Sequence, residues 1–191
     1  AQVASLPYDV MDSEEARAIT KDNPYSFLRV TKSEVDLPAG TPVHSLAVYE
    51  KARENLQDMI EKGILAQDDK PCFYIYRQQM GSHIQVGLVA AASVEEYKTN
   101  QIRKHELTRP DKEQDRVDHI TATEAQTGAV FLTYKASETV NALLSQCMAK
   151  TPVYDFTTDD GIIHTFFVVD EEAKIKAIEQ SSAKPPASKC I

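Results

Sequence analysis

Acidic, basic and phosphate-binding side chains crowd into residues 103–116. Glu106 is expected to act as a catalytic base or a metal ligand, because a carboxylate held near cations can accept a proton from a substrate hydroxyl or bind a hydrated divalent ion. His105 is the second candidate catalytic residue, although strand neighbours point to opposite faces and only one of the two would reach a given ligand. Three side chains can supply positive charge to a phosphoryl group: Lys104, Arg109 and Arg116. The segment therefore predicts a site for a phosphorylated ligand, with Glu106 as catalytic base or metal ligand.

The same segment also fits a solvated helix start whose opposite charges pair weakly with each other. In that interpretation Glu106 forms a surface salt bridge with Arg109. A further hypothesis concerns a helix that Pro110 can open at its first turn. Three residues would then lie four apart on one face of that helix: Asp111, Asp115 and His119. Such a ladder can ligate a metal ion, but it is more often a hydrated helix face.

Composition and charge exclude several classes of function. The chain has 191 residues, of which 42% are hydrophobic, and its formal net charge is −8. This charge opposes binding to nucleic-acid phosphates and to anionic lipid, so we expect no DNA partner and no membrane. No apolar run approaches the length of a membrane span, and no signal-peptide pattern opens the chain. Three scattered cysteines are too few for a disulfide framework, which favours a reducing cytoplasm: Cys72, Cys147 and Cys190.

Several catalytic motifs are missing from the sequence. It contains no Gly-x-x-x-x-Gly-Lys loop, dinucleotide glycine fingerprint, Gly-x-Ser-x-Gly elbow or Cys-x-x-Cys pair. Their absence disfavours P-loop ATPases, Rossmann dehydrogenases, serine hydrolases of the elbow type and thiol redox enzymes. The remaining histidines, His44, His83 and His164, show no mutual spacing that suggests a zinc site.

Strands and helices alternate irregularly around the charged segment. The hydrophobic spacing predicts a helix over 45–62, and Asp12 with Glu15 matches a capping box that opens a short helix. Period-two patterns with glycine turns predict hairpins over 72–91 and 153–169. The other expected elements are an extended segment at 7–10, strands at 25–30 and 128–134, a loop at 31–45, and helices opened by Pro110, by Ser137 and by Glu171. The pattern indicates an α+β fold: a mixed, mainly antiparallel sheet with two hairpins and packed helices.

We expect a single α+β domain over residues 1–180 and a disordered tail over 181–191. The tail has no periodicity and contains Lys184-Pro185-Pro186, a composition typical of disordered segments. The chain is expected to be a fragment of a longer protein, because it starts at Ala1 and ends in this tail.

Several blocks in order resemble a widespread bacterial family of unknown function, often labelled SpoOJ/ParA/ParB/RepB family protein. The resemblance extends from near the start to about Val169. The blocks that carry it are Pro7–Val10, Asn23–Val30, Tyr74–Gln78 and Lys104–Lys112 with Asp115 and Arg116.

Members of that family usually continue into an Asp-Gly-His-His-Arg block, which is similar to the phosphate-handling motif of ParB-like nucleotide-binding proteins and free serine kinases. This chain has no such block. By resemblance to those kinases, Glu106 would be the base beside His105, and the expected cofactor is ADP or ATP with Mg²⁺. The resemblance thus implies a nucleotide-binding protein or small-molecule phosphotransferase. The alternative is a non-catalytic interaction module that binds a protein partner through its acidic surface and two hairpins.

Overall fold

Two compact units, interleaved along the chain, make up the computed structural model of this protein. The structure describes residues 1–104, 107–182 and 188–190. The helical unit combines 2–67 with 107–130, and the sheet unit combines Ala1 with the described parts of 68–106 and 131–191. Each unit has its own hydrophobic cluster, so each is described by itself.

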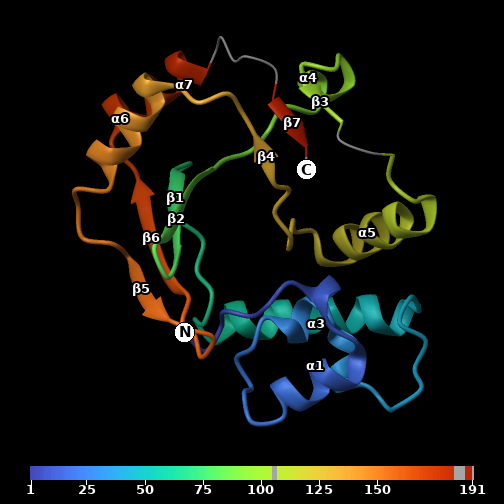
Figure 1. Ribbon diagram of the computed structural model, residues 1–191. Coiled ribbons are helices and arrows are strands. Elements are labelled where there is room, and N and C mark those ends of the chain that lie inside the picture. Colours follow the sequence, from blue (N-terminus) through green and yellow to red (C-terminus); the bar gives the residue numbers. More distant parts are fainter. Residues whose placement is uncertain (105–106, 183–187, 191) are drawn as a thin grey trace. The chain divides into compact units, whose positions relative to one another are not determined.

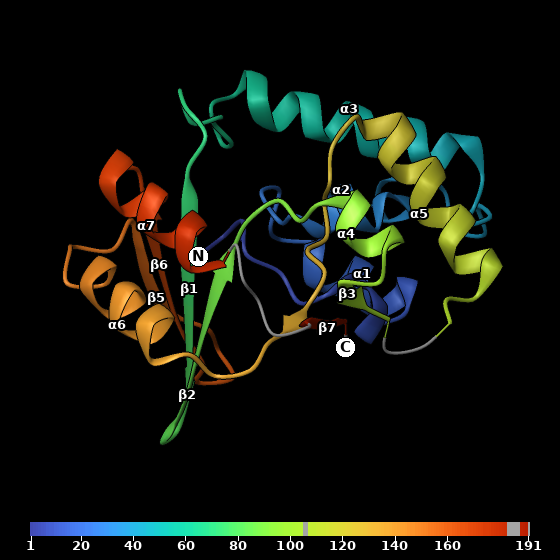
Figure 2. The same cartoon turned by 90° about the horizontal axis from the view of Figure 1, so that it is seen from above.

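The helical unit is built around the long helix α3, against which α5 packs. Figure 1 shows α5 above α3, and Figure 2 shows that the two helices run at an angle to each other. One face of α3 carries the buried apolar residues that the spacing predicts, including Ala52, Leu56 and Met59. Leu56 and Met59 pack with Val30 into the cluster at the centre of this unit. The elements of the unit are η1 (Tyr8–Val10), α1 (Ser13–Thr20), α2 (Leu28–Thr31), η2 (Ser33–Asp36), α3 (Leu46–Glu61) and α5 (Pro110–Thr123).

The sheet unit contains a four-stranded antiparallel sheet with the strand order β2-β1-β6-β5. Both hairpin turns use a glycine with positive φ, Gly81 at +58° and Gly161 at +82°, a conformation that glycine adopts without a Cβ clash. The sheet strands are β1 (Phe73–Met80), β2 (His83–Val89), β5 (Tyr154–Thr157) and β6 (Ile163–Val169), and the helices of the unit are α4 (Val94–Lys98), α6 (Glu138–Cys147) and α7 (Glu172–Ser182).

One face of this sheet forms the core of the unit. Thr165, Phe167 and Val169 alternate along β6 as buried residues. The apolar members pack with Ile75 of β1 and against helices α6 and α7, which lie on the same side of the sheet in Figure 2. The alternate residues of β6 and β1 face the other way and include several half-buried aromatic side chains.

A second, smaller sheet in the same unit has the order β3-β7-β4. It joins β3 (Ile102–Arg103) in parallel and β4 (Leu132–Thr133) antiparallel to β7 (Ser188–Cys190). Arg103, the first residue of the charged segment, thus ends β3, and the segment leads to α5, the helix that Pro110 is predicted to open.

The predicted α+β class is confirmed, as are the helix over 45–62, the two hairpins and the helices opened by Pro110 and by Ser137. Asp12 Oδ1 accepts from the Glu14 and Glu15 N–H groups, both at 2.8 Å, and Glu15 returns the bond to the Asp12 N–H at 2.9 Å. The predicted capping box is therefore also confirmed.

Three element predictions are wrong. Residues 25–30 form a turn leading into α2, because the N–H groups of Tyr25 and Leu28 donate to Asn23 Oδ1 (3.1 Å) and Ser26 Oγ (3.4 Å) instead of to a neighbouring strand. Residues 8–10 form a 3₁₀ turn instead of an extended segment. The strand expected over 128–134 contains only Leu132 and Thr133.

The single domain over 1–180 and the disordered tail over 181–191 stay predictions. Of the tail, residues 183–187 and 191 lie outside the described part of the chain, residues 181–182 end α7, and 188–190 form β7. Among the described helices, none is long and apolar enough to cross a membrane.

Candidate functional site

The predicted catalytic pair cannot be placed. His105 and Glu106 lie outside the described residues, so their roles, and the alternative Glu106–Arg109 salt bridge, stay predictions. Lys104 follows β3 in the sheet unit, with its ammonium group 4.8 Å from the centre of the Tyr97 ring.

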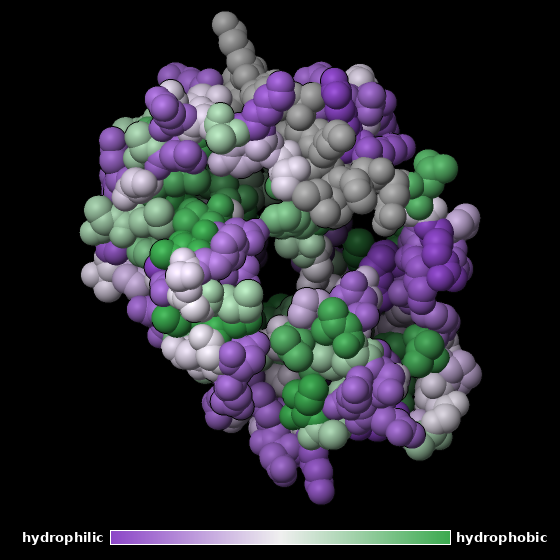
Figure 3. Space-filling model, viewed as in Figure 1, coloured by the Kyte–Doolittle hydropathy of each residue, from purple (hydrophilic) through white to green (hydrophobic). Residues whose placement is uncertain are grey.

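Arg109 and Arg116, the other predicted phosphate contacts, belong to the helical unit. Arg109 immediately precedes α5 and binds Asp111 through Nε (3.2 Å) and Nη2 (2.7 Å). This hydrogen-bonded guanidinium lowers the pKa of the Asp111 carboxyl. Both side chains are exposed, so this pair is a hydrated surface contact of the kind that the alternative interpretation expects. The surface over α5 is strongly hydrophilic in the view of Figure 3.

Arg116, in contrast, is held firmly. Its Nε and Nη2 donate to Asp115 Oδ2 at 3.0 and 2.6 Å, and its guanidinium lies 4.3 Å from the centre of the Tyr8 ring. A guanidinium has five N–H donors, so those of Nη1 and one of Nη2 are not used by Asp115. The side chain is 30% exposed, which leaves these donors within reach of a ligand.

Asp115 joins Arg116 to the start of α3. Its Oδ1 accepts from His44 Nδ1 at 2.7 Å and from the Tyr49 hydroxyl at 2.8 Å. Burial raises the pKa of Asp115, but the hydrogen bonds from Arg116, Tyr49 and His44 outweigh it and leave the pKa below its usual value. The carboxylate is therefore ionised at neutral pH and can only accept hydrogen bonds.

Because the Asp115 carboxylate is ionised, His44 and Tyr49 must both be the donors in their hydrogen bonds to it. The hydrogen of the first bond lies on His44 Nδ1, because the Asp115 carboxylate can only accept, so Nε2 is the acceptor of the ring in its neutral form, on a side chain that is 54% exposed. Burial and the neighbouring Asp115 carboxylate raise the pKa of Tyr49, so this phenol stays protonated and donates. An imidazole oriented by a carboxylate is the arrangement that general bases use.

The first turn of α3 adds backbone donors. Ser45 occupies the N-cap position without a side-chain capping bond, and the first turn of α3 has no acidic residue. Ser45 Oγ is the buried side-chain oxygen that lacks a hydrogen-bond partner within the part of the chain that the structure describes. Uncapped N–H groups and the helix dipole favour an anion at such an end. We call His44, Ser45, Asp115 and Arg116 the α3-start cluster.

The proposed metal ladder on α5 does not assemble. Asp111 binds Arg109, while His119 turns inward, is buried, and donates from Nε2 to the Val30 carbonyl at 3.0 Å. Burial lowers the pKa of His119 despite that bond, so the ring is neutral. No three His, Cys, Asp or Glu side chains among the described residues are placed to hold a metal ion. Glu106 as a metal ligand stays a prediction.

A comparison with protein families matches residues 1–188 to a family described as "Protein of unknown function (DUF1015)". The chain belongs to this family. Comparisons of this DUF1015 chain with curated proteins and with solved structures give no match.

Sequence reasoning on this DUF1015 chain missed His44 and Tyr49, which lie 71 and 66 residues from Asp115. Tyr49 was assigned to the apolar stripe of α3, where its ring is indeed buried. The available signal was the long loop before α3, which ends in His44 and Ser45 directly before the first turn. The sequence predicts Asp115 as a member of a metal ladder and of a block that carries the resemblance, and not as the partner of His44.

Proposed function

We propose that this protein is a cytoplasmic, ParB-like nucleotide-binding protein that catalyses phosphoryl transfer to a small molecule, and that it binds a phosphate group of its ligand at the α3-start cluster. The observation that carries the proposal is the arrangement in which one ionised carboxylate, Asp115, fixes both His44 and Arg116 beside the uncapped end of α3. The resemblance to ParB-like nucleotide-binding proteins supports the choice of a nucleotide.

The cluster offers a phosphate three kinds of donor. Arg116 can give two or more parallel N–H bonds, a geometry that suits phosphate oxygens. The Ser45 hydroxyl and the first-turn N–H groups of α3 add neutral donors. Because Asp115 and Tyr8 already hold the Arg116 side chain in place, little side-chain freedom is lost when a ligand binds.

His44 can move a proton in this setting. Its Nε2 is the free acceptor of an imidazole that Asp115 orients, so it can take the proton of an attacking hydroxyl next to a bound phosphoryl group. Glu106 is the other proposed base, or the ligand of Mg²⁺ that accompanies ADP or ATP, with His105 beside it. Lys104 and Arg109 are proposed as further phosphate contacts, since both are cationic side chains of the segment that leads into α5.

The test is calorimetry of the longest natural form of the protein with ADP, ATP and CTP in the presence of Mg²⁺. We expect heat of binding for one of these nucleotides and a loss of roughly 10- to 150-fold in affinity for Arg116→Gln, because a hydrogen bond to a charged group contributes about 1.5–3 kcal/mol. Arg53→Gln is the matched control, since Arg53 is an exposed arginine on α3. Absence of heat for the wild type, or equal affinity for Arg116→Gln, overturns the proposal.

Turnover separates the two candidate bases. In an assay of phosphoryl transfer, His44→Asn lowers kcat if His44 is the base, and Glu106→Gln lowers it if Glu106 is the base or metal ligand. A base contributes on the order of 10²- to 10⁴-fold in rate. Nucleotide binding without turnover removes phosphoryl transfer from the proposal and leaves nucleotide binding, whereas the absence of both favours the non-catalytic interaction module.

A further inference from the structure

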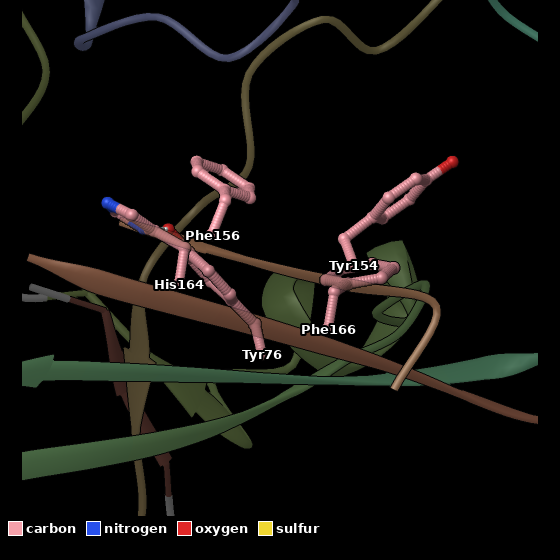
Figure 4. A pocket seen from close by; sticks show the side chains of 5 residues that line it. All are labelled: Tyr76, Tyr154, Phe156, His164 and Phe166. Atoms are coloured by element: carbon pink, nitrogen blue, oxygen red, sulfur yellow. Dashed lines mark hydrogen bonds between the residues drawn. The ribbon is translucent and has the colours of Figure 1, made fainter. Parts of the chain in front are cut away.

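An open cavity of about 250 Å³ lies on the face of the four-stranded sheet opposite to α6 and α7. Only rings line it: Tyr76 of β1, Tyr154 and Phe156 of β5, and His164 and Phe166 of β6. Figure 4 shows all five side chains standing on the same side of the strands. The register explains this, because Tyr154 and Tyr76 both pair with Phe166, and Phe156 pairs with His164.

Ring contacts fix the floor of this cavity. His164 stacks between Phe156 and Tyr76, with centroid distances of 5.1 and 5.9 Å and interplanar angles of 20° and 15°. Phe166 lies 6.2 Å from Tyr76 and 6.1 Å from Tyr154, and these pairs are tilted by 57° and 40°. The rings of Phe156, His164 and Tyr76 therefore form a stacked row, whereas Phe166 is tilted relative to its two neighbours.

The polar atoms of the floor are already bonded to each other. Thr158 Oγ1 donates to Asp160 Oδ1 (2.5 Å), so it accepts from His164 Nε2 (3.1 Å). His164 Nδ1 then accepts from the Tyr76 hydroxyl at 2.6 Å. These hydrogen bonds engage both ring nitrogens of His164, so the face of the ring rather than its nitrogens is left for a ligand in the cavity.

The size and charge of the cavity select its ligand. Its volume is below the 300–1,000 Å³ of sites for drug-sized ligands, so it fits one small head group. No Lys or Arg lines it, which leaves a phosphate or carboxylate without a cationic partner. Ring faces carry negative charge, the chain has a net charge of −8, and the Asp160 carboxylate lies two hydrogen bonds from the ring of His164. All three features favour a cation.

The spacing of the two β5 rings suits such a cation. Residues two apart on a strand are about 6.6 Å apart on the same face, and Figure 4 shows a gap between Tyr154 and Phe156. Two rings that rise from such neighbouring positions can both approach a cation placed between them to the ~6 Å from each ring centre at which cation–π attraction is significant. A quaternary ammonium group also needs no hydrogen-bond acceptor, and the floor offers none that is free.

We propose that this face of the sheet is an aromatic cage for a quaternary or methylated ammonium group, which binds between Tyr154 and Phe156 over Phe166 and His164. The cage belongs to the sheet unit alone, so the proposal does not depend on the phosphate site in the helical unit.

The test is an NMR titration of the full chain with choline and, in parallel, with 3,3-dimethylbutan-1-ol, in which carbon replaces the charged nitrogen. We expect upfield shifts of the choline N-methyl protons, caused by the ring currents, and at least tenfold weaker binding of the neutral isostere. Equal binding of both probes overturns the proposal, as does tighter binding of adenosine, which would mark the cavity as a platform for planar rings.

Variants locate the binding site. Tyr154 is 60% exposed, so Tyr154→Leu keeps an apolar side chain with little risk to folding and should weaken choline binding roughly five- to thirtyfold. Tyr154→Phe retains the ring and should bind nearly as the wild type does. Tyr134→Leu, which replaces an exposed tyrosine of the same unit outside the cavity, is the matched control. Unchanged binding in Tyr154→Leu and Phe156→Leu, with melting curves that confirm folding, contradicts the cage.

Discussion

Asp115 shows how one half-buried carboxylate can define the chemistry of its neighbours. It receives hydrogen bonds from an imidazole, a phenol and a guanidinium at 2.6–3.0 Å. These bonds determine which nitrogen of His44 carries the proton and hold Arg116 in place. The site therefore depends on a residue that contacts no ligand itself, and Asp115 is a positioning residue in the proposed mechanism.

His119, one turn further along α5, gives a pH prediction. Burial lowers its pKa from 6.5, so the unfolded chain binds a proton at a pH where the folded chain does not. Stability then rises with pH through this window, and it is lost as pH falls below about 6.5. We expect His119→Gln, whose amide can still donate to the Val30 carbonyl, to lose less stability than the wild type between pH 7 and pH 5.

Urea unfolding followed by circular dichroism at several pH values measures this difference. The exposed His83 provides the control, since His83→Gln should leave the slope of the wild type unchanged. A steeper loss of stability in His119→Gln than in the wild type contradicts the assignment of a neutral, buried ring.

At the scale of elements, the start of α1 depends on its capping box. Asp12 accepts from two N–H groups that otherwise have no partner within the helix. We expect Asp12→Ala to lower the free energy of unfolding by about 1 kcal/mol, within a range of roughly 0.5–2 kcal/mol. Chemical denaturation compares this variant with Asp22→Ala, an exposed aspartate just after the helix, which should change stability little.

Local patterns predicted most of the elements, and failed where side chains replaced backbone partners. The apolar stripe of α3 and the glycine turns of both hairpins depend only on residues close together in the sequence. These elements therefore form as predicted. Residues 25–30 alternate like a strand, yet Asn23 and Ser26 take up the N–H groups and turn the chain into α2. Only the fold determines which of these competing bonds forms.

The candidate site was harder to predict than the elements. The charge of Arg116 predicts a phosphate contact, and this role stays a prediction; the contacts with Asp115 and Tyr8 that hold the side chain have no signal in the local sequence. The contact of His44 with Asp115 requires α3 and α5 to cross, and no local pattern specifies which of their residues meet. The aromatic cavity arises from strand register, because Phe156 and His164 become neighbours only when β5 and β6 pair.

At the scale of the whole molecule, two separate hydrophobic clusters predict where a core mutation acts. Leu56 is buried in the helical unit and Leu144 in the sheet unit, with 7% and 4% of their surface exposed. Leu56→Ala and Leu144→Ala should each cost about 2–5 kcal/mol. Hydrogen exchange should show the larger loss of protection in the unit that carries the mutation. A uniform loss over both units in either variant contradicts this assignment.

The interleaving of the two units affects how the protein is made. A ribosome releases α3 long before α5, although α5 packs on α3 in the helical unit. The β1–β2 hairpin likewise emerges well before β6, its other neighbour in the sheet. During synthesis, the incomplete helical unit exposes apolar surface of α3 and the incomplete sheet exposes an open strand edge of β1, and both features make a chain prone to aggregation. A truncation between residues 67 and 107 therefore leaves neither unit whole, and to obtain the helical unit alone a linker must replace residues 68–106 between its two segments.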